Sequence, residues 1–363
     1  MLQTTRRAAG AAFALALLVA LALVPQAAWQ TRGLFESELN SPGTLQVLAL
    51  MLVFGGVALS YDLLFGFTGL LSFGHALPFA VGVYFFAVGL SKWEWGFAQA
   101  ILATLAVGLL LPVVLGVVAL RVGGIAFAMV TLAFAQAGNV LVQKNPDKLT
   151  GGEEGLALQY ESLPDSLVGV FNTKNLYWIA LGYLAAVAAI SWWATASSPG
   201  RVWQAIRENE KRVEVLGLRP FSYKLMAFVL ASFLATAGGI VWVLLIGNAT
   251  PEVTTANFTL GLLVMVVIGG TGTRWGAILG GVLYTFLDQR LPSFVDNEQV
   301  RDLPGVLRTP LSEPLFVLGT LFILIVFFLP GGIVGLRSRG LRLLESRARG
   351  AEPAPPVEPE AGT

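Results

Sequence analysis

The sequence predicts an all-α, polytopic membrane protein with about ten transmembrane or partly re-entrant helices and one cytosolic helix between them. Hydrophobic residues make up 55% of the chain and charged residues only 12%, whereas roughly a quarter of the residues in a soluble domain are charged. Apolar runs alternate with short polar segments along the chain, and a helix needs about 20 residues to cross a bilayer.

Ten apolar runs are candidates for the membrane-crossing helices. The first follows Arg6 and Arg7 and has features of a secretory signal peptide, but the many runs after it favour a retained helix. The eighth and ninth are short and could be tilted, broken or re-entrant. The runs are residues 8–24, 45–64, a third that ends near residue 90, 97–120, 125–142, 176–196, 225–246, 258–270, 276–287 and 314–329.

The basic residues predict the orientation of these runs, because Lys and Arg concentrate in cytoplasmic loops. With the N-terminus inside and the runs alternating, 15 of the 23 Lys and Arg residues fall inside. Both termini are therefore expected in the cytoplasm. The transmembrane domain is expected over residues 1–336, followed by a tail, 337–363, that is basic and then rich in Pro, Glu and Ala, a composition typical of disorder.

Several chemistries are excluded by composition. The chain has no cysteine and a single histidine, His75, so disulfides, thiolate chemistry and multi-histidine zinc sites are excluded. It contains no phosphate-binding GxxxxGK[ST] motif. The net charge of +1 is segregated by loop and gives no indication of a nucleic-acid partner.

The longest strongly charged segment between apolar runs is residues 197–224. Ser198 is a good N-cap, Pro199 suits the first helical turn and Gly217 supplies a stop. The segment is either a loop held inside by its charge or an amphipathic helix that docks in a cleft of a soluble partner. Apolar residues recur along it at near-helical spacing, interrupted by Asn209: Val202, Ile206, Val213 and Leu216.

Two glycine-rich breaks interrupt the apolar sequence, at residues 66–74 and 268–281. Each contains a Thr-Gly pair followed by a further Gly and an apolar run, which suggests a parallel internal repeat or a chance similarity. The glycines could serve close helix packing, or the breaks could be interrupted helices whose freed backbone groups line a polar path. The candidate path residues are Thr68, Gly69, Ser72, His75, Gly270, Thr271 and Gly272.

Two other functions stay open on the residues alone. Asp62 is the one acid in the middle of an apolar run and could carry a proton in a stand-alone carrier, with a channel as the related alternative. Ser72 and His75 lie three residues apart and could belong to an intramembrane hydrolase, although no partnered acid accompanies them.

From about residue 47 to 336 the chain resembles the permease subunits of branched-chain amino acid ABC transporters, the LivM-like branch. Five blocks carry the resemblance in the family's order: LLFGFTGLLSFGHALPFAVGVY from Leu63, GGIAFAMVTLAFAQ from Gly123, LTGGEEGL from Leu149, GRVWQAIRENEKRVEVLGLRPFSYKLMAFVLASFLATAGG from Gly200, and MVVIGGTGTRWGAILGG from Met265.

The resemblance implies a transport subunit, not an enzyme, in a bacterial or archaeal cytoplasmic membrane. Its implied partners are a second, related permease, two cytosolic ATPases that hold the ATP and Mg, and an extracytoplasmic substrate-binding protein; no cofactor is expected in this chain. It implies half of an alternating-access path for leucine, isoleucine and valine, or other hydrophobic amino acids, with urea and short amides as the first alternative.

The resemblance also makes the charged segment a coupling helix. Its candidate ATPase-coupling residues are Arg201, Ile206, Arg207, Glu208, Lys211, Arg212, Val213, Leu216 and Gly217. ABC permeases often carry Glu-Ala-Ala, three residues and then Gly in this loop. Ending that pattern on Gly217 places Lys211, Arg212 and Val213 in the Glu-Ala-Ala positions, so detailed ATPase contacts do not carry over.

Overall fold

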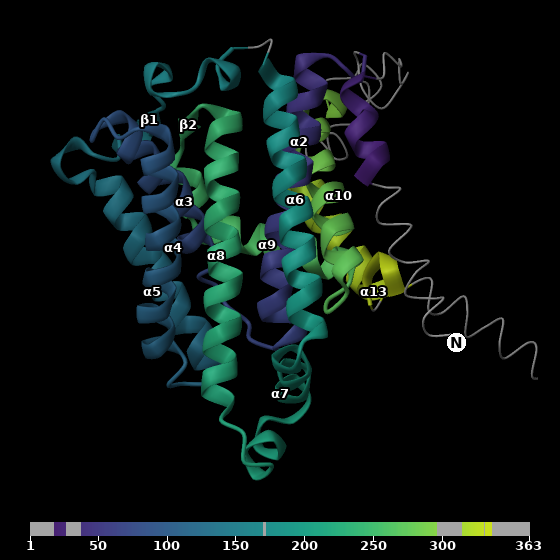
Figure 1. Cartoon of the computed structure of the whole chain (residues 1–363). Helices are drawn as coiled ribbons and strands as arrows, with labels where there is room; N and C mark the ends of the chain where they lie inside the picture. The colour runs from purple at the N-terminus through teal and green to yellow at the C-terminus, as the bar shows by residue number, and fades with distance from the viewer. Residues whose placement is uncertain (1–17, 27–37, 170–171, 296–313, 330, 336–363) are drawn as a thin grey trace, which may run out of the picture.

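The structure, a computed structural model, is a bundle of helices (Figure 1) and describes residues 18–26, 38–169, 172–295, 314–329 and 331–335. Five helices are long and apolar enough to cross a membrane: α2 (Pro42–Asp62, continued by η2, Leu63–Phe67), α4 (Phe97–Ala119), α5 (Ile125–Lys144), α6 (Thr173–Ala196) and α8 (Pro220–Ile246). Shorter helices are α3 (Ala76–Ser91), α7 (Ser198–Val215), α9 (Ala256–Gly269) and α13 (Pro314–Phe328), and α10 runs over Arg274–Val295. The predicted all-α membrane architecture is confirmed.

The predicted runs agree with the helices in most places. The eighth run is short in the structure too, because α9 has 14 residues. The ninth run was predicted too short: α10 has 22 residues and includes Asp288, Gln289 and Arg290. Most of the first run and the tail lie outside the described residues.

The polar connection between α5 and α6 folds over the upper end of the bundle (Figure 1). It consists of single helical turns, η3 (Pro146–Lys148), η4 (Gly152–Glu154), η5 (Tyr160–Ser162) and η6 (Asp165–Leu167), and of strand β1 (Leu156–Ala157). β1 pairs antiparallel with β2 (Asn248–Ala249), in the register Leu156 to Ala249. β2 follows α8 and precedes η8 (Pro251–Thr254), so this pairing fixes the α8–α9 connection to the same end.

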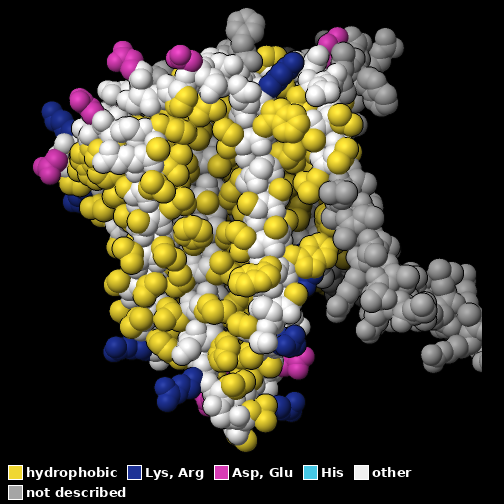
Figure 2. Space-filling view, viewed as in Figure 1, with side chains coloured by type: hydrophobic (Ala, Val, Ile, Leu, Met, Phe, Trp, Pro, Cys, Tyr) yellow, Lys and Arg dark blue, Asp and Glu magenta, His cyan; other side chains and the backbone are white. Residues whose placement is uncertain are grey.

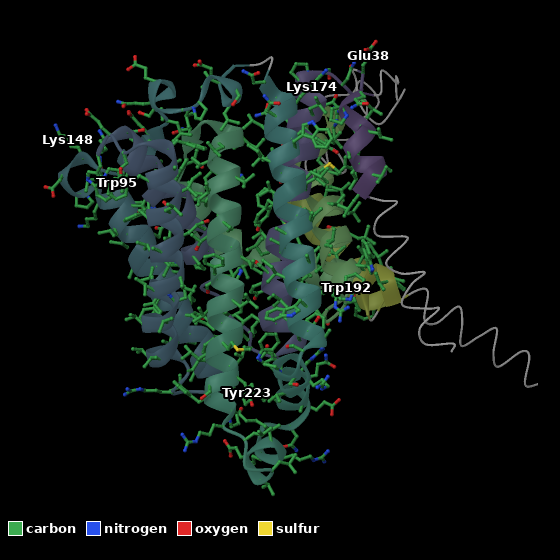
Figure 3. The ribbon with its side chains drawn as sticks, in the orientation of Figure 1. Glu38, Trp95, Lys148, Lys174, Trp192 and Tyr223 are labelled. Atoms are coloured by element: carbon green, nitrogen blue, oxygen red, sulfur yellow. The ribbon has the colours of Figure 1, made fainter. Side chains whose placement is uncertain are left out.

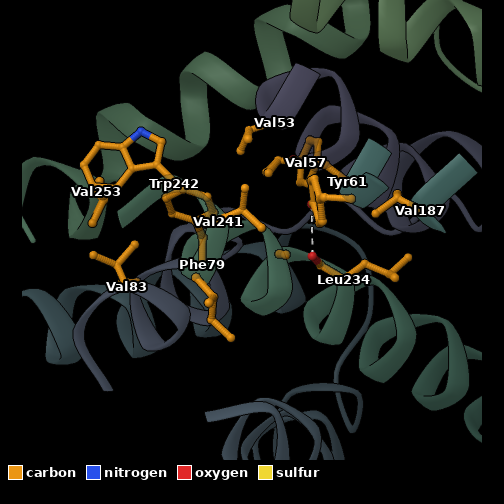
Figure 4. Packing of buried hydrophobic residues seen from close by; sticks show 14 of the residues in the cluster. Val53, Val57, Tyr61, Phe79, Val83, Val187, Leu234, Val241, Trp242 and Val253 are labelled. Carbon is orange, nitrogen blue, oxygen red and sulfur yellow. Dashed lines mark hydrogen bonds between the residues drawn. The ribbon is translucent and has the colours of Figure 1, made fainter. Parts of the chain in front are cut away.

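Helix α2 lies at the centre, packed along α6, α8 and α10. Glycines bring backbones close together at these contacts: a Cβ on Gly281 would lie 2.7 Å from Phe54 O, and one on Gly239 would lie 2.2 Å from Phe79 O. Close backbone approach through small residues is a recurrent way to pack helices in a membrane. Figure 4 shows the apolar core around Phe79 and Trp242. The Leu234 carbonyl accepts a hydrogen bond from the Tyr183 hydroxyl at 3.0 Å.

The outer surface carries a broad apolar belt (Figure 2). Large apolar side chains are exposed on it, including Leu110, Ile125 and Trp193. Charged side chains gather at the two ends instead (Figure 2): Glu38, Lys148 and Lys174 lie at the upper end (Figure 3), and the charged residues of α7 lie at the lower end, near Tyr223. This distribution suits a protein whose middle faces lipid, and the chain is an integral membrane protein.

Candidate functional site

The first glycine-rich break is an interruption between α2 and α3. After Asp62, α2 continues as η2, a single π-helical turn, a distortion that is frequent at functional sites. The Thr68 hydroxyl donates to Leu63 O at 2.9 Å and closes this turn. Gly69 then adopts a φ of +76°, which glycine tolerates at no steric cost, and helix starts again at Ala76.

The second break is the tight connection between α9 and α10. Gly270 and Gly272 have φ values of +116° and +73°, and the Thr273 hydroxyl donates to Gly270 O at 2.6 Å. The two helices leave the turn in close contact, because a Cβ on Gly269 would lie 1.8 Å from Gly276 O. Both predicted interruptions are therefore present in the structure.

The two breaks meet at Asp62. Its Oδ1 accepts a hydrogen bond from Gly272 N at 2.8 Å, although the residues are 210 positions apart. Gly66 lies in the same contact, since a Cβ there would come within 1.9 Å of Asp62 Oδ1 and 2.3 Å of Gly272 N. Asp62 is fully buried, and its Oδ2 has no hydrogen-bond partner among the described residues. Burying a carboxylate is costly unless it is paired.

Arg207 of α7 completes this cluster. Its Nη1 donates to Gly66 O, its guanidinium acts electrostatically on Asp62, and a Cβ on Gly69 would lie 3.0 Å from its Cγ. We call Asp62, Gly66, Arg207 and Gly272 the junction. The junction joins the end of α2, the α9–α10 turn and the charged helix α7.

Helix α7 differs from its prediction in two places. The N-cap is Ser197, whose Oγ accepts from Gly200 N at 3.4 Å, so Ser198 already belongs to the helix. Asn209 is non-helical, with φ −162° and ψ 101°, and its Oδ1 accepts from Arg212 N at 3.0 Å. Asn209 therefore divides α7 into two pieces and caps the second, as Asn does at helix starts. The predicted stop at Gly217 is confirmed by its φ of +82°.

The apolar stripe of α7 packs mainly on this chain. Ile206 and Val213 are buried, whereas Leu216 is 73% exposed. The expectation that all three form one docking face is therefore wrong: two of them hold α7 against its own bundle. Trp203, which the stripe left out, is fully buried and donates from Nε1 to Tyr223 O at 2.8 Å.

The charged residues of α7 are exposed, although Arg201 donates to Ser198 Oγ at 3.0 Å. Arg201, Glu208, Lys211 and Arg212 are exposed, as is Gly217. Glu208 and Arg212 are four residues apart, a spacing at which helical side chains can pair, but Asn209 interrupts the helix between them, and among the described residues neither makes an ion pair. The ion pair of this region, among the described residues, joins Lys224 to Glu210.

The remaining path candidates stabilise the first break from inside. Thr68, Ser72 and His75 are each 1% exposed. The Ser72 carbonyl accepts from the Tyr61 hydroxyl at 3.0 Å, and His75 Nε2 lies 3.2 Å from Ser60 Oγ. Because His75 pairs with Ser60 and not with Ser72, the hydrolase alternative loses its catalytic pair. Thr271 is partly exposed in the second break.

The candidate path residues did not include Asp62, which the sequence suggested only as a proton carrier, or Gly66, which begins the first glycine-rich break. The available signal was the isolation of Asp62 in an apolar run, because an ionisable residue there is functional by default. No spacing rule connects Asp62 with Gly272, so only the fold reveals their contact.

Comparisons with known proteins agree with this architecture. The family model described as "Branched-chain amino acid transport system / permease component" matches residues 43–328. The chain is 27% identical over 339 residues to the high-affinity branched-chain amino acid transport system permease protein LivM of Salmonella typhimurium, covering 86% of this chain and 75% of the relative.

Two further relatives extend the comparison. The probable branched-chain amino acid transport permease protein LivM of Methanocaldococcus jannaschii is 24% identical over 335 residues, covering 80% of this chain and 94% of the relative. The autoinducer 2 import system permease protein LsrC of Yersinia pseudotuberculosis is 31% identical over 160 residues, covering 40% of this chain and 44% of the relative. No solved structure matches the chain.

Proposed function

Because the chain belongs to the family of branched-chain amino acid transport system permease components, we propose that it forms half of the path by which an ATP-binding-cassette importer carries leucine, isoleucine and valine. The observation that carries the proposal is the match of the family model over residues 43–328. The chain is a transport subunit and not itself an enzyme, so the driving chemistry belongs to other subunits.

The proposed partners follow from this assignment. A second, related permease supplies the other half of the path, and an extracytoplasmic binding protein delivers the amino acid. Two cytosolic ATPases bind ATP and Mg and contact α7, which places the lower end of Figure 1 in the cytoplasm. Both termini then lie on the cytoplasmic side of a bacterial or archaeal cytoplasmic membrane, as the basic residues indicate.

The junction gives the transmission step of the mechanism. Arg207 is part of the first piece of α7, so an ATPase that moves this piece also moves Arg207. Trp203 and Ile206 fasten the same piece to the bundle. Arg207 holds Gly66 O directly, and Gly66 contacts Gly272. Displacement of α7 is thereby passed to the ends of α2, α9 and α10 together.

The two breaks are the moving part of this mechanism. The candidate path residues Thr68, Gly69, Ser72, His75, Gly270, Thr271 and Gly272 lie in them. Interrupted helices bend where backbone bonds are already missing, so reorientation concentrates there. The three buried side chains of the first break become pathway residues when the break opens.

Reconstitution of the complete complex tests the proposal. The permease, its partner permease, both ATPases and the binding protein are placed in proteoliposomes, and uptake of leucine, isoleucine, valine and urea is measured with and without ATP. ATP-dependent uptake of the branched-chain amino acids is expected. Uptake of urea alone would replace the substrate assignment, and leucine uptake without any ATPase would favour a carrier.

A further inference from the structure

A hollow with one polar wall lies between α2, α9 and α10, apart from the junction. Phe54 comes from α2, Phe258 and Met265 from α9, and Thr285 and Asp288 from α10. The hollow has a volume of about 150 Å³, smaller than the roughly 300–1,000 Å³ of sites for drug-sized ligands. This volume limits the hollow to a small solute or to part of one.

The charge in this hollow is negative. Asp288 is partly buried on its wall, and the carboxylate of Glu252 in η8 acts on it electrostatically. The partner of the Asp288 carboxylate among the described residues is the Gln289 amide, at a long 3.5 Å. Arg290, the nearest basic residue along α10, does not line the hollow. Partly buried carboxylates are stabilised by a cation, and this cation can come from a solute.

An independent observation points to the same ligand position. Thr285 lines the hollow three residues before Asp288, on the same face of α10. It is 3% exposed, and its hydroxyl has no hydrogen-bond partner among the described residues. Buried polar groups nearly always have a partner, so a bound polar molecule would satisfy this hydroxyl.

The opposite wall is apolar and aromatic. The rings of Phe54 and Phe258 lie 6.0 Å apart between centroids, tilted by 51°, and Leu262 and Met265 extend the wall. A carboxylate, a free hydroxyl and an aliphatic surface within one hollow match the ammonium group, the carboxylate and the side chain of an aliphatic amino acid.

We propose that this hollow is the chain's substrate half-site, in which Asp288 binds the α-ammonium group, Thr285 donates to the carboxylate, and Phe54 and Phe258 contact the aliphatic side chain. The inference rests on the proposed function and adds the residues and the solute class.

The test is leucine uptake by the reconstituted complex at saturating, leucine-loaded binding protein. Asp288→Asn is expected to lower the maximal rate about tenfold or more, the usual effect of losing a hydrogen bond to a charged group. Asp288→Glu, which keeps the charge, is expected to retain the rate within a few-fold. Thr285→Val is expected to lower the rate severalfold. Asp147→Asn, an exposed carboxylate on η3, is the matched control and is expected to match the unmodified chain.

Co-purification of the ATPases with each variant shows that the complex assembles. If both Asp288→Asn and Thr285→Val assemble and transport leucine within twofold of the unmodified complex, the half-site is overturned while the proposed function stands. Should Asp288→Asn fail to assemble, the other two variants decide. A severalfold lower rate for Thr285→Val with a retained rate for Asp288→Glu supports the half-site, and a rate for Thr285→Val within twofold of the unmodified complex overturns it. An unmodified complex that moves no branched-chain amino acid contradicts the proposed function itself.

Discussion

Replacing Arg207 by Gln tests the transmission step. Arg207 is the residue of α7 that reaches the broken end of α2, through its donation to Gly66 O. A hydrogen bond to a charged group contributes about 1.5–3 kcal/mol, and about 1.4 kcal/mol corresponds to a tenfold change in an equilibrium. Losing this bond should therefore shift the equilibrium that couples the position of α7 to the conformation of the breaks by about 10- to 100-fold.

The assay is ATP hydrolysis by the reconstituted complex, stimulated by the loaded binding protein. Arg207→Gln should remove most of the stimulation, whereas Arg207→Lys, which keeps the charge, should recover part of it. Arg121→Gln is the matched control, because Arg121 is exposed in the α4–α5 connection and away from the junction. Stimulation by Arg207→Gln at the unmodified level, in an assembled complex, would refute the role of the junction.

Three further predictions concern the first break, α7 and the orientation. Gly69→Leu should cut uptake about tenfold or more while the ATPases still co-purify, because its φ of +76° strains any side chain and its Cβ would lie 3.0 Å from Arg207 Cγ; uptake at the normal rate would show that the break only serves packing. The double variant Val215→Asp and Leu216→Asp should weaken ATPase co-purification without lowering the thermal unfolding midpoint of the permease, because both side chains are exposed. Ile206→Asp should lower that midpoint, because it buries an unpaired charge. An unaffected ATPase association in the double variant would remove Val215 and Leu216 from the docking surface. Reporter fusions after Val142 and after Leu336 should report outside and inside respectively, and fusions that report the same side would show that the number of crossings is wrong.

Hydrophobicity was enough to predict the fold class and most helices, because apolar runs of this length form helices in a bilayer. It failed at α10, where Asp288, Gln289 and Arg290 end the apolar run but not the helix. Asp288 lines the hollow and the helix continues through all three polar residues, so composition underestimated the length of the helix.

The prediction for α7 failed where local geometry decides. Asn209 leaves the helical conformation and caps the second piece, which changes the face on which later residues lie. Val213 follows this kink and is still buried, whereas Leu216 is the C-cap, beyond the last helical residue Val215, and is exposed. Trp203 lies three residues before Ile206, at helical spacing, and could have been included in the stripe from the sequence.

The site itself depends on contacts between distant residues. Glycines at 66 and 272 indicated interruptions, and the structure has them. That both interruptions meet at Asp62 depends on the packing of α2 against α9 and α10, which no local pattern encodes. The role of the breaks in transport stays a prediction.

ATP-dependent uptake of radiolabelled leucine into proteoliposomes that contain the complete complex tests the central claim most directly. The permease assignment predicts that leucine accumulates only when this chain, both ATPases, ATP and the binding protein are all present. Accumulation in liposomes that contain this chain alone, or none in the complete complex while another solute is taken up, would contradict it.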